Sequence, residues 1–240
     1  MSGSLADRLE FPQGSAVYPG RHEVVDALFH AADGTLVPVV VKKARIDARQ
    51  RRLGRTRAER ALSTARRLLA AGVDTPEPLE SGTVGDESWY VARKLEGALQ
   101  VRAWFGHRSA PRKFPAPPPE PSFEEVARRV GRLARSVHDA GIHFRDFTDG
   151  NVLVTGWPAE VRLWIVDLDR AVEKRRVGFL DRLRDLARPG LNTVADRDLL
   201  LEGYFGPSPS PAWAWLAVTL LRLRIRFWDD VKLRARPWRR

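Results

Sequence analysis

Hydrophobic residues come in short β-type runs through the first part of the chain. Two such runs, at residues 24–29 and 36–43, flank the pair Asp33-Gly34. An Asp-Gly pair between apolar runs is a strong signal for a tight β-hairpin. Another β-type run lies at residues 89–94. We therefore predict a small antiparallel sheet in this region.

Elsewhere the apolar residues recur at helical spacing. Residues 45–67 form a very basic stretch. Within it and just after it, apolar residues recur at helical spacing at Ala58, Leu62, Ala65, Leu68 and Leu69. We predict one amphipathic helix there, ending before Gly72. A second helix follows the capping-box pattern at residues 122–125. Its predicted buried face consists of Val126, Val130, Leu133, Ala134 and Val137.

The change from strand-type to helix-type periodicity predicts an α+β chain, and 240 residues can form either one domain or two small lobes. We expect the two-lobed arrangement. Residues 1–95 would form a small, β-rich N-lobe with one helix, and residues 96–240 a mostly helical C-lobe. A Pro-rich linker at residues 107–121 should be extended rather than packed. It could serve as a mobile insertion or as a plain spacer.

Charge and composition narrow the class of protein. The formal net charge of +11 favours anionic partners such as nucleic acid, an acidic membrane surface or a phosphorylated substrate. The alternative is a basic composition that only decorates solvated surfaces. The chain has no cysteine, which excludes disulfides and thiolate sites. The N-terminal residues lack an apolar signal-peptide core, so we expect a protein inside the cell.

The most informative stretch is His-Phe-Arg-Asp-Phe-Thr-Asp-Gly-Asn at residues 143–151, which precedes an apolar run. Asn151 follows Asp146 by five residues. Protein-kinase-like enzymes use this spacing in the catalytic loop, where the Asp accepts the proton of the attacking hydroxyl and the Asn binds magnesium. A turn between a helix and a strand favours the same residue types and is the alternative interpretation.

Three more residues complete the set that phosphoryl transfer needs. Asp167, in Ile-Val-Asp-Leu-Asp, stands where such enzymes keep a second metal-binding carboxylate. Lys42 ends a Val-Val-Val-Lys run like that of a nucleotide-binding lysine, and we prefer it to Lys43. Glu59, the only carboxylate on the first predicted helix, is the candidate partner of that lysine. A solvent-facing lysine and a surface glutamate among arginines are the alternatives.

The segment Leu-Glu-Gly at residues 95–97 would be the hinge between the lobes. In protein-kinase-like enzymes the backbone of the hinge binds the adenine edge of the nucleotide. We therefore assign Glu96 to the nucleotide site. Lys42, Asn151 and Asp167 complete the cofactor-binding set for ATP and Mg²⁺. There is no Gly-x-Gly-x-x-Gly motif in the chain.

With these motifs the chain resembles the lipopolysaccharide core kinases, the Kdo/heptose kinase family, which have a compact protein-kinase-like fold. The resemblance spans residues 20–205. It rests on the segments 68–76, 141–147, 165–170 and 184–186. It implies an ATP-dependent kinase of a sugar hydroxyl on lipid A-core, with Asp146 as catalytic base, Asn151 and Asp167 as metal ligands, Lys42 as the ATP lysine, and Asp185 as an anchor of the catalytic loop.

The chain departs from that family at three positions. Phe144 replaces the usual His, Asp169 stands where Gly or His is more common, and Glu59 is offset from the family's helix Glu. These departures leave two alternatives open. One is a kinase acting on a small-molecule alcohol or on protein Ser/Thr, and the other is a catalytically weak, kinase-like binding module. Nucleic-acid binding would explain the charge but not the motifs, and we do not expect it.

The C-terminal segment bears on the partner. Its apolar residues at helical spacing are Trp213, Leu216, Leu220, Leu223 and Phe227. Arg222, Arg224 and Arg226 flank them. Such a helix suits an anionic membrane surface, which predicts a cytoplasmic protein peripheral to the inner face of the inner membrane. A last helix packed on the C-lobe with a solvated basic end is the alternative, and one helix can do both.

Overall fold

The structure is a computed structural model that describes residues 4–15, 17–18, 23–206 and 212–234. The chain forms two compact units. The first unit comprises Met1–Ala98 and Trp164–Ala171, and the second comprises Leu99–Leu163 and Val172–Arg240. The segment that carries Asp167, which the sequence placed with the C-lobe, therefore belongs to the first unit by its contacts.

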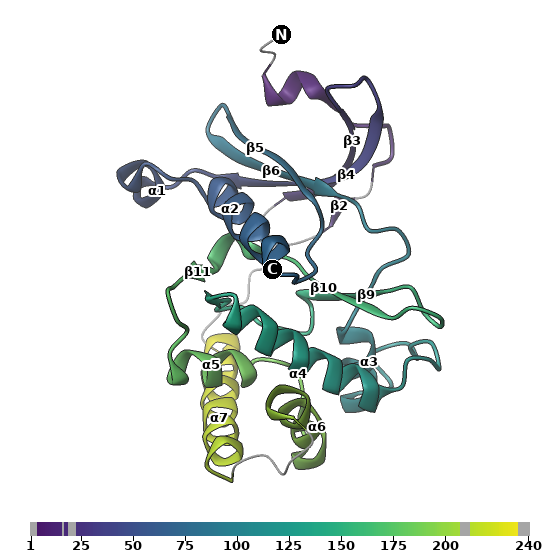
Figure 1. Cartoon of the computed structure of the whole chain (residues 1–240), viewed down its shortest axis with the longest axis vertical. Coiled ribbons are helices and arrows are strands. Elements are labelled where there is room, and N and C mark those ends of the chain that lie inside the picture. Colours follow the sequence, from purple (N-terminus) through teal and green to yellow (C-terminus); the bar gives the residue numbers. More distant parts are fainter. Residues whose placement is uncertain (1–3, 16, 19–22, 207–211, 235–240) are drawn as a thin grey trace. The chain divides into compact units, whose positions relative to one another are not determined.

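The first unit is built on an antiparallel sheet with the strand order β1-β3-β4-β6-β5, in which β2 also pairs with β3 (Figure 1). Its strands are β1 (Leu9–Glu10), β2 (Val17–Tyr18), β3 (Glu23–His30), β4 (Leu36–Arg45), β5 (Pro78–Val84) and β6 (Glu87–Arg93). The predicted hairpin joins β3 and β4. Asp33 Oδ1 accepts hydrogen bonds from the Thr35 backbone and hydroxyl, and Gly34 adopts the positive φ that the turn requires. The hairpin prediction is confirmed.

Alternate residues of β4 face opposite sides of the sheet, as the strand period requires. Val39 and Val41 are fully buried with Val91 of β6. A short 3₁₀ helix, η1 (Leu5–Arg8), closes this apolar cluster through Leu5. The side chain of Lys42 therefore lies on the other face, where it belongs to the candidate site.

The single helix predicted after β4 is two helices, so that prediction is wrong in part. They are α1 (Ala48–Leu53) and α2 (Arg57–Ala70). Gly54 ends α1 in the left-handed conformation, and the side chain of Thr56 caps the start of α2. The predicted apolar face of α2 is buried at Ala58, Ala65 and Leu68, whereas Leu69 is exposed.

The second unit is mainly helical (Figure 1). Its helices are α3 (Arg102–Ser109), α4 (Phe123–Asp139), α5 (Phe179–Leu186), α6 (Val194–Phe205) and α7 (Ala212–Arg234). All five residues of the predicted α4 face are buried, which confirms that prediction. Gly131 and Gly203 let α4 and α6 approach closely, because a Cβ at either glycine would meet a backbone oxygen of the other helix at 2.1 or 2.0 Å.

Short strands frame the loops of the second unit. They are β7 (Leu99–Gln100), β8 (Ile142–His143), β9 (Val152–Thr155) and β11 (Val172–Glu173). β7 pairs with β9, and β8 pairs with β11. β10 (Arg162–Ile165) runs across the boundary between the units, and the 3₁₀ helix η2 (Leu168–Arg170) follows it.

The Pro-rich linker at residues 107–121 is packed at both ends, contrary to the expectation of an extended segment. Its first residues continue α3, and the ring of Phe114 lies against Gly106. Trp104 Nε1 donates a 2.8 Å hydrogen bond to the backbone oxygen of Pro121. The two aromatic residues anchor the segment to α3, which the abundance of proline obscured.

Candidate active site

In the first unit Lys42 meets two carboxylates. Its Nζ forms an ion pair with Asp167 Oδ1, and it lies 3.2 Å from Asp169 Oδ2. The position on β4 fixes Lys42 opposite Val24 and Tyr90 on the neighbouring strands. The structure thus brings together two residues that the sequence assigned to one site.

The segment around Asp167 is tied to the turn that follows α2. Thr75 Oγ1 donates to the Ile165 carbonyl at 2.8 Å, and the Ile165 amide donates to the Asp74 carbonyl at 3.0 Å. Asp167 itself has a φ of 63°, in the left-handed region that non-glycine residues seldom adopt. Such backbone strain persists only where the surroundings hold it, and it occurs often at functional sites.

Asp169, one of the departures from the family pattern, is a buried member of this cluster. Burial raises the pKa of its carboxyl, and the neighbouring charge of Asp167 acts in the same direction. The Lys42 ammonium opposes both effects by lowering that pKa. Asp169 is therefore the second carboxylate that contacts the Lys42 ammonium.

Glu59 does not have the contact that the sequence predicted. Its Oε2 accepts hydrogen bonds from the backbone and the hydroxyl of Thr56, which completes a capping box at the start of α2. Among the described residues Lys42 forms its ion pairs with the two aspartates. The carboxylate of Glu59 satisfies its own helix start, so we correct its assignment as the partner of Lys42.

Glu96 is exposed and lies in the turn just before Gly97, near the end of the first unit's longer segment. Gly97 has a φ of 63°, which lets the chain turn there. The assignment of Glu96 to the nucleotide site stays a prediction.

In the second unit Asp146 and Asn151 lie at the two ends of one compact turn. Asn151 Nδ2 donates to the Asp146 carbonyl at 2.9 Å, and the Thr148 amide donates to the same oxygen at 2.7 Å. The first of these bonds orients the Asn151 amide so that its Oδ1 remains as a ligand atom. Arg188 Nη1 lies 3.6 Å from Asp146 Oδ1. The predicted pair is thus brought together.

The backbone leading into Asp146 is held by Asp185 of α5. The two oxygens of Asp185 accept hydrogen bonds from the amides of Phe144 and Arg145, each 2.9 Å long. Arg145 has a φ of 69°, a conformation that needs such support. The structure confirms Asp185 as the anchor of this loop.

Phe144, the residue in place of the usual His, is fully buried. Its ring packs edge-on against Phe147 with the ring centres 5.9 Å apart. Phe144 therefore works as an apolar support under the loop, and its backbone amide still reaches Asp185.

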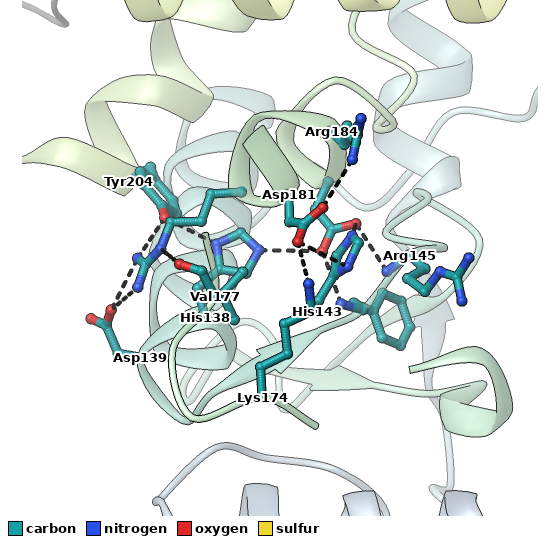
Figure 2. Close-up of polar contacts among 12 residues, drawn as sticks. His138, Asp139, His143, Arg145, Lys174, Val177, Asp181, Arg184 and Tyr204 are labelled. Atoms are coloured by element: carbon teal, nitrogen blue, oxygen red, sulfur yellow. Dashed lines mark hydrogen bonds and ion pairs between the residues drawn. The ribbon is translucent and has the colours of Figure 1, made fainter. Parts of the chain in front are cut away.

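The structure shows a buried network that sequence reasoning missed. His138 of α4 lies between Tyr204 of α6 and Asp185 (Figure 2). Arg182 of α5 joins it through the Tyr204 hydroxyl. These contacts link residues far apart in the chain, and no local motif signals them.

His143 lies beside the same anchor, and burial is the main cause that lowers its pKa. The charges of Asp185 and Asp181 oppose this by raising that pKa, but burial prevails. A group with a lowered pKa in the folded state stabilises the fold above its unfolded pKa of roughly 6.5. This contribution is lost as the pH falls through the folded-state pKa.

We therefore expect the unfolding temperature to fall as the pH drops from about 7 to about 5. A His143→Gln variant cannot titrate, so its unfolding temperature should depend less on pH over this range. Thermal unfolding followed by circular dichroism measures both slopes. Equal slopes in the two proteins would contradict the role of His143.

The oxygen donors present suit a magnesium ion. Mg²⁺ takes hard oxygen ligands, and each unit has one candidate: the carboxylate of Asp167 in the first unit and the side-chain amide oxygen of Asn151 in the second. No group of three or more His, Cys, Asp or Glu side chains arranged for a metal ion occurs in the described part of the chain.

α7 combines a packed face with an exposed apolar face. Ala214 and Val218 are buried. The exposed face, called here the α7 apolar face, has side chains between 50% and 62% exposed and consists of Trp213, Leu216, Leu220, Leu223 and Phe227. The exposed ring of Phe179 on α5 adjoins it, 4.9 Å from the Trp213 ring.

Not every predicted basic neighbour borders this face. Arg222 turns inward and donates to the Arg188 carbonyl at 2.9 Å, whereas Arg224 is exposed. The side chain of Arg226 and the basic residues 235–240 lie outside the described part. A search of the described helices finds none long and apolar enough to cross a membrane.

Comparison with known proteins agrees with this architecture. A solved structure, WaaP in complex with acyl carrier protein, is similar with a TM-score of 0.54 at 22% identity and covers 90% of each chain. The predicted α+β, protein-kinase-like fold is thereby confirmed.

Sequence relatives point the same way. The 3-deoxy-D-manno-octulosonic acid kinase of Actinobacillus succinogenes is 27% identical over 153 residues, which cover 58% of this chain and 59% of the relative. The protein of the same name from Haemophilus influenzae (strain 86-028NP) is 26% identical over 125 residues, covering 50% and 47%. The chain thus spans about half the length of the curated relatives it matches. A family model matches residues 39–195, well over half of the chain, and the protein belongs to the lipopolysaccharide kinase (Kdo/WaaP) family.

Proposed function

We propose that the protein is an ATP- and Mg²⁺-dependent kinase that phosphorylates a sugar hydroxyl of lipopolysaccharide core or of a related lipid-linked glycan. The observation that carries the proposal is the turn with Asp146 and Asn151 at its ends, held from behind by Asp185. Family membership and the names of the relatives support the same reaction and the same class of acceptor.

The chemistry would be mostly positioning. When bound, Mg²⁺-ATP supplies the phosphoryl group and cations that offset its charge. Asp146 would accept a hydrogen bond from the acceptor hydroxyl and take its proton. Lys42 would bind the nucleotide phosphates, oriented by Asp169. Asn151 and Asp167 would supply the oxygen ligands of the metal.

An acceptor screen tests the proposal. The protein is incubated with ATP and Mg²⁺, and with lipopolysaccharide, 3-deoxy-D-manno-octulosonic acid derivatives, small soluble alcohols or a generic protein Ser/Thr substrate. We expect phosphate transfer to the core-sugar acceptors. Transfer only to small alcohols, or only to protein, would show that the acceptor is not a core sugar and would assign that other class instead. Absence of ATP binding in a thermal-shift measurement would favour a non-catalytic binding module.

We also propose that the α7 apolar face lies on the anionic cytoplasmic surface of the inner membrane. Exposed leucine and aromatic side chains beside a basic residue, on a chain with a net charge of +11, support this location. A membrane surface would also bring the enzyme to a lipid-linked acceptor.

The protein should therefore sediment with phosphatidylglycerol vesicles and less with phosphatidylcholine vesicles. Leu220→Glu should weaken the binding by about tenfold or more, because it removes one exposed leucine that the membrane would bury and adds a negative charge. Leu53→Glu is the matched control, since Leu53 on α1 is 58% exposed and Leu220 is 57% exposed. Equal vesicle binding by both variants would contradict the location. Acyl carrier protein, the partner in the similar solved structure, is tested in the same way, and binding to it without binding to vesicles would also contradict the location.

A further inference from the structure

Four side chains of the second unit form a chain of hydrogen bonds that ends at Asp185, the anchor of the loop (Figure 2). Arg182 Nη1 donates to the Tyr204 hydroxyl at 2.9 Å. That hydroxyl lies 3.0 Å from His138 Nδ1, and His138 Nε2 lies 3.3 Å from Asp185 Oδ2. The chain begins at the surface, where both Nη atoms of Arg182 lie 3.1 Å from Asp139 Oδ1, and it ends at a fully buried carboxylate.

The chemistry of each group gives the chain a direction. An arginine only donates, so the Tyr204 oxygen accepts from Arg182, and its own proton is available for His138 Nδ1. Burial is the main cause that raises the pKa of Tyr204, which keeps this proton on the hydroxyl. An ionised carboxylate only accepts, so His138 Nε2 donates to Asp185. One histidine tautomer, with the proton on Nε2, satisfies every contact.

The last carboxylate in this chain is the one that holds the backbone before Asp146. Oδ2 of Asp185 receives the His138 contact and also the amide of Phe144, while Oδ1 receives the amide of Arg145. A rotation of this carboxylate would release one or both amides. The positive φ of Arg145 would then lose its support, and the next residue, Asp146, would move.

We propose that His138 and Tyr204 are positioning residues, which hold the Asp185 carboxylate in the orientation that places Asp146 for the reaction. This inference rests on the proposed function, in which Asp146 receives the acceptor hydroxyl. Neither residue touches substrate. Their effect passes through Asp185 and the two amides that it binds.

Tyr204→Phe is the most direct variant, because it removes one oxygen and leaves the ring. The kcat should fall by roughly tenfold or more, because small displacements of a catalytic group are costly, while the KM for ATP stays unchanged. His138→Gln should keep most of the activity, because its amide can donate to Asp185 and accept from Tyr204. His138→Leu should lose it, since it can do neither.

Leu200→Ala is the matched control. Leu200 is fully buried on α6, one turn before Tyr204, so its truncation destabilises the same helix and leaves the network intact. Its kcat per folded molecule should equal that of the wild type. If His138→Leu fails to fold, the comparison of Tyr204→Phe with Leu200→Ala still decides.

Hydrogen exchange gives a readout that does not need activity. In the full chain the amides of Phe144 and Arg145 should exchange at least about tenfold faster in Tyr204→Phe than in Leu200→Ala, relative to amides of α4 in the same protein. Unchanged exchange and unchanged kcat in Tyr204→Phe would overturn the inference. A wild type that transfers no phosphate, with the exchange difference present, would overturn the proposed function but not the role of the two residues in holding the loop.

Discussion

Replacing Asp146 with Asn is expected to lower kcat by about 10²- to 10⁴-fold, the usual contribution of a positioned general base. The change preserves size and the backbone contacts of the turn, because the hydrogen bonds from Asn151 and Thr148 go to the carbonyl of residue 146. It removes the capacity to take a proton, together with the negative charge that faces Arg188. Steady-state phosphate transfer at saturating ATP and acceptor measures the loss.

Asp198→Asn is the control for this variant, since Asp198 is an exposed residue of α6 outside the proposed site. Its kcat should match that of the wild type. The unfolding temperature of Asp146→Asn should stay close to that of the wild type, because the turn is preserved. A kcat within about twofold of the wild type for Asp146→Asn would remove this residue from the proposed mechanism.

Replacing Lys42 with Met should abolish measurable ATP binding, whereas Lys43→Met should retain it. The two lysines are adjacent on β4 and point to opposite faces of the sheet. Lys42 Nζ lies with Asp167 and Asp169, whereas Lys43 Nζ pairs with Glu23 at 2.8 Å and lies over the Trp89 ring. Only Lys42 is therefore placed beside the proposed metal ligand.

Isothermal titration with Mg²⁺-ATP measures this difference. The Lys42→Met variant also leaves two carboxylates without their ammonium, so its folding is checked by circular dichroism. Equal affinities of the two lysine variants for ATP would contradict the choice of Lys42. Loss of binding in Lys43→Met alone would transfer the role to Lys43.

Local patterns predicted much of the architecture. The Asp33-Gly34 hairpin and the apolar face of α4 depend on residues close in sequence, and both are present as expected. The catalytic-loop spacing likewise brought Asp146 and Asn151 to one turn. These features are local because turn chemistry and side-chain period act over a few residues.

Two errors had a signal in the sequence that went unused. Thr56-Arg-Ala-Glu59 is itself a capping box, which marks a helix start and commits Glu59 to its own backbone. Gly54, just before it, marks the end of the preceding helix. Weighing these residues would have divided the predicted helix and removed Glu59 as the partner of Lys42.

The network behind Asp185 had no such signal. His138, Tyr204 and Asp185 come from three helices and meet only through tertiary packing. A single histidine on an apolar helix face is compatible with many environments, and its partners depend on how the helices cross. The fold was therefore needed to show that His138 stands behind the loop.

One measurement tests the central claim most directly. Purified protein, ATP labelled in the γ-phosphate and Mg²⁺ are incubated with lipopolysaccharide, and mass spectrometry of the isolated core locates any added phosphate. The proposed function predicts one phosphate on a core-sugar hydroxyl with the wild type and Asp198→Asn, and transfer slower by about 10²-fold or more with Asp146→Asn. Absence of transfer by a wild type that binds ATP, or transfer that persists at the wild-type rate in Asp146→Asn, would contradict it.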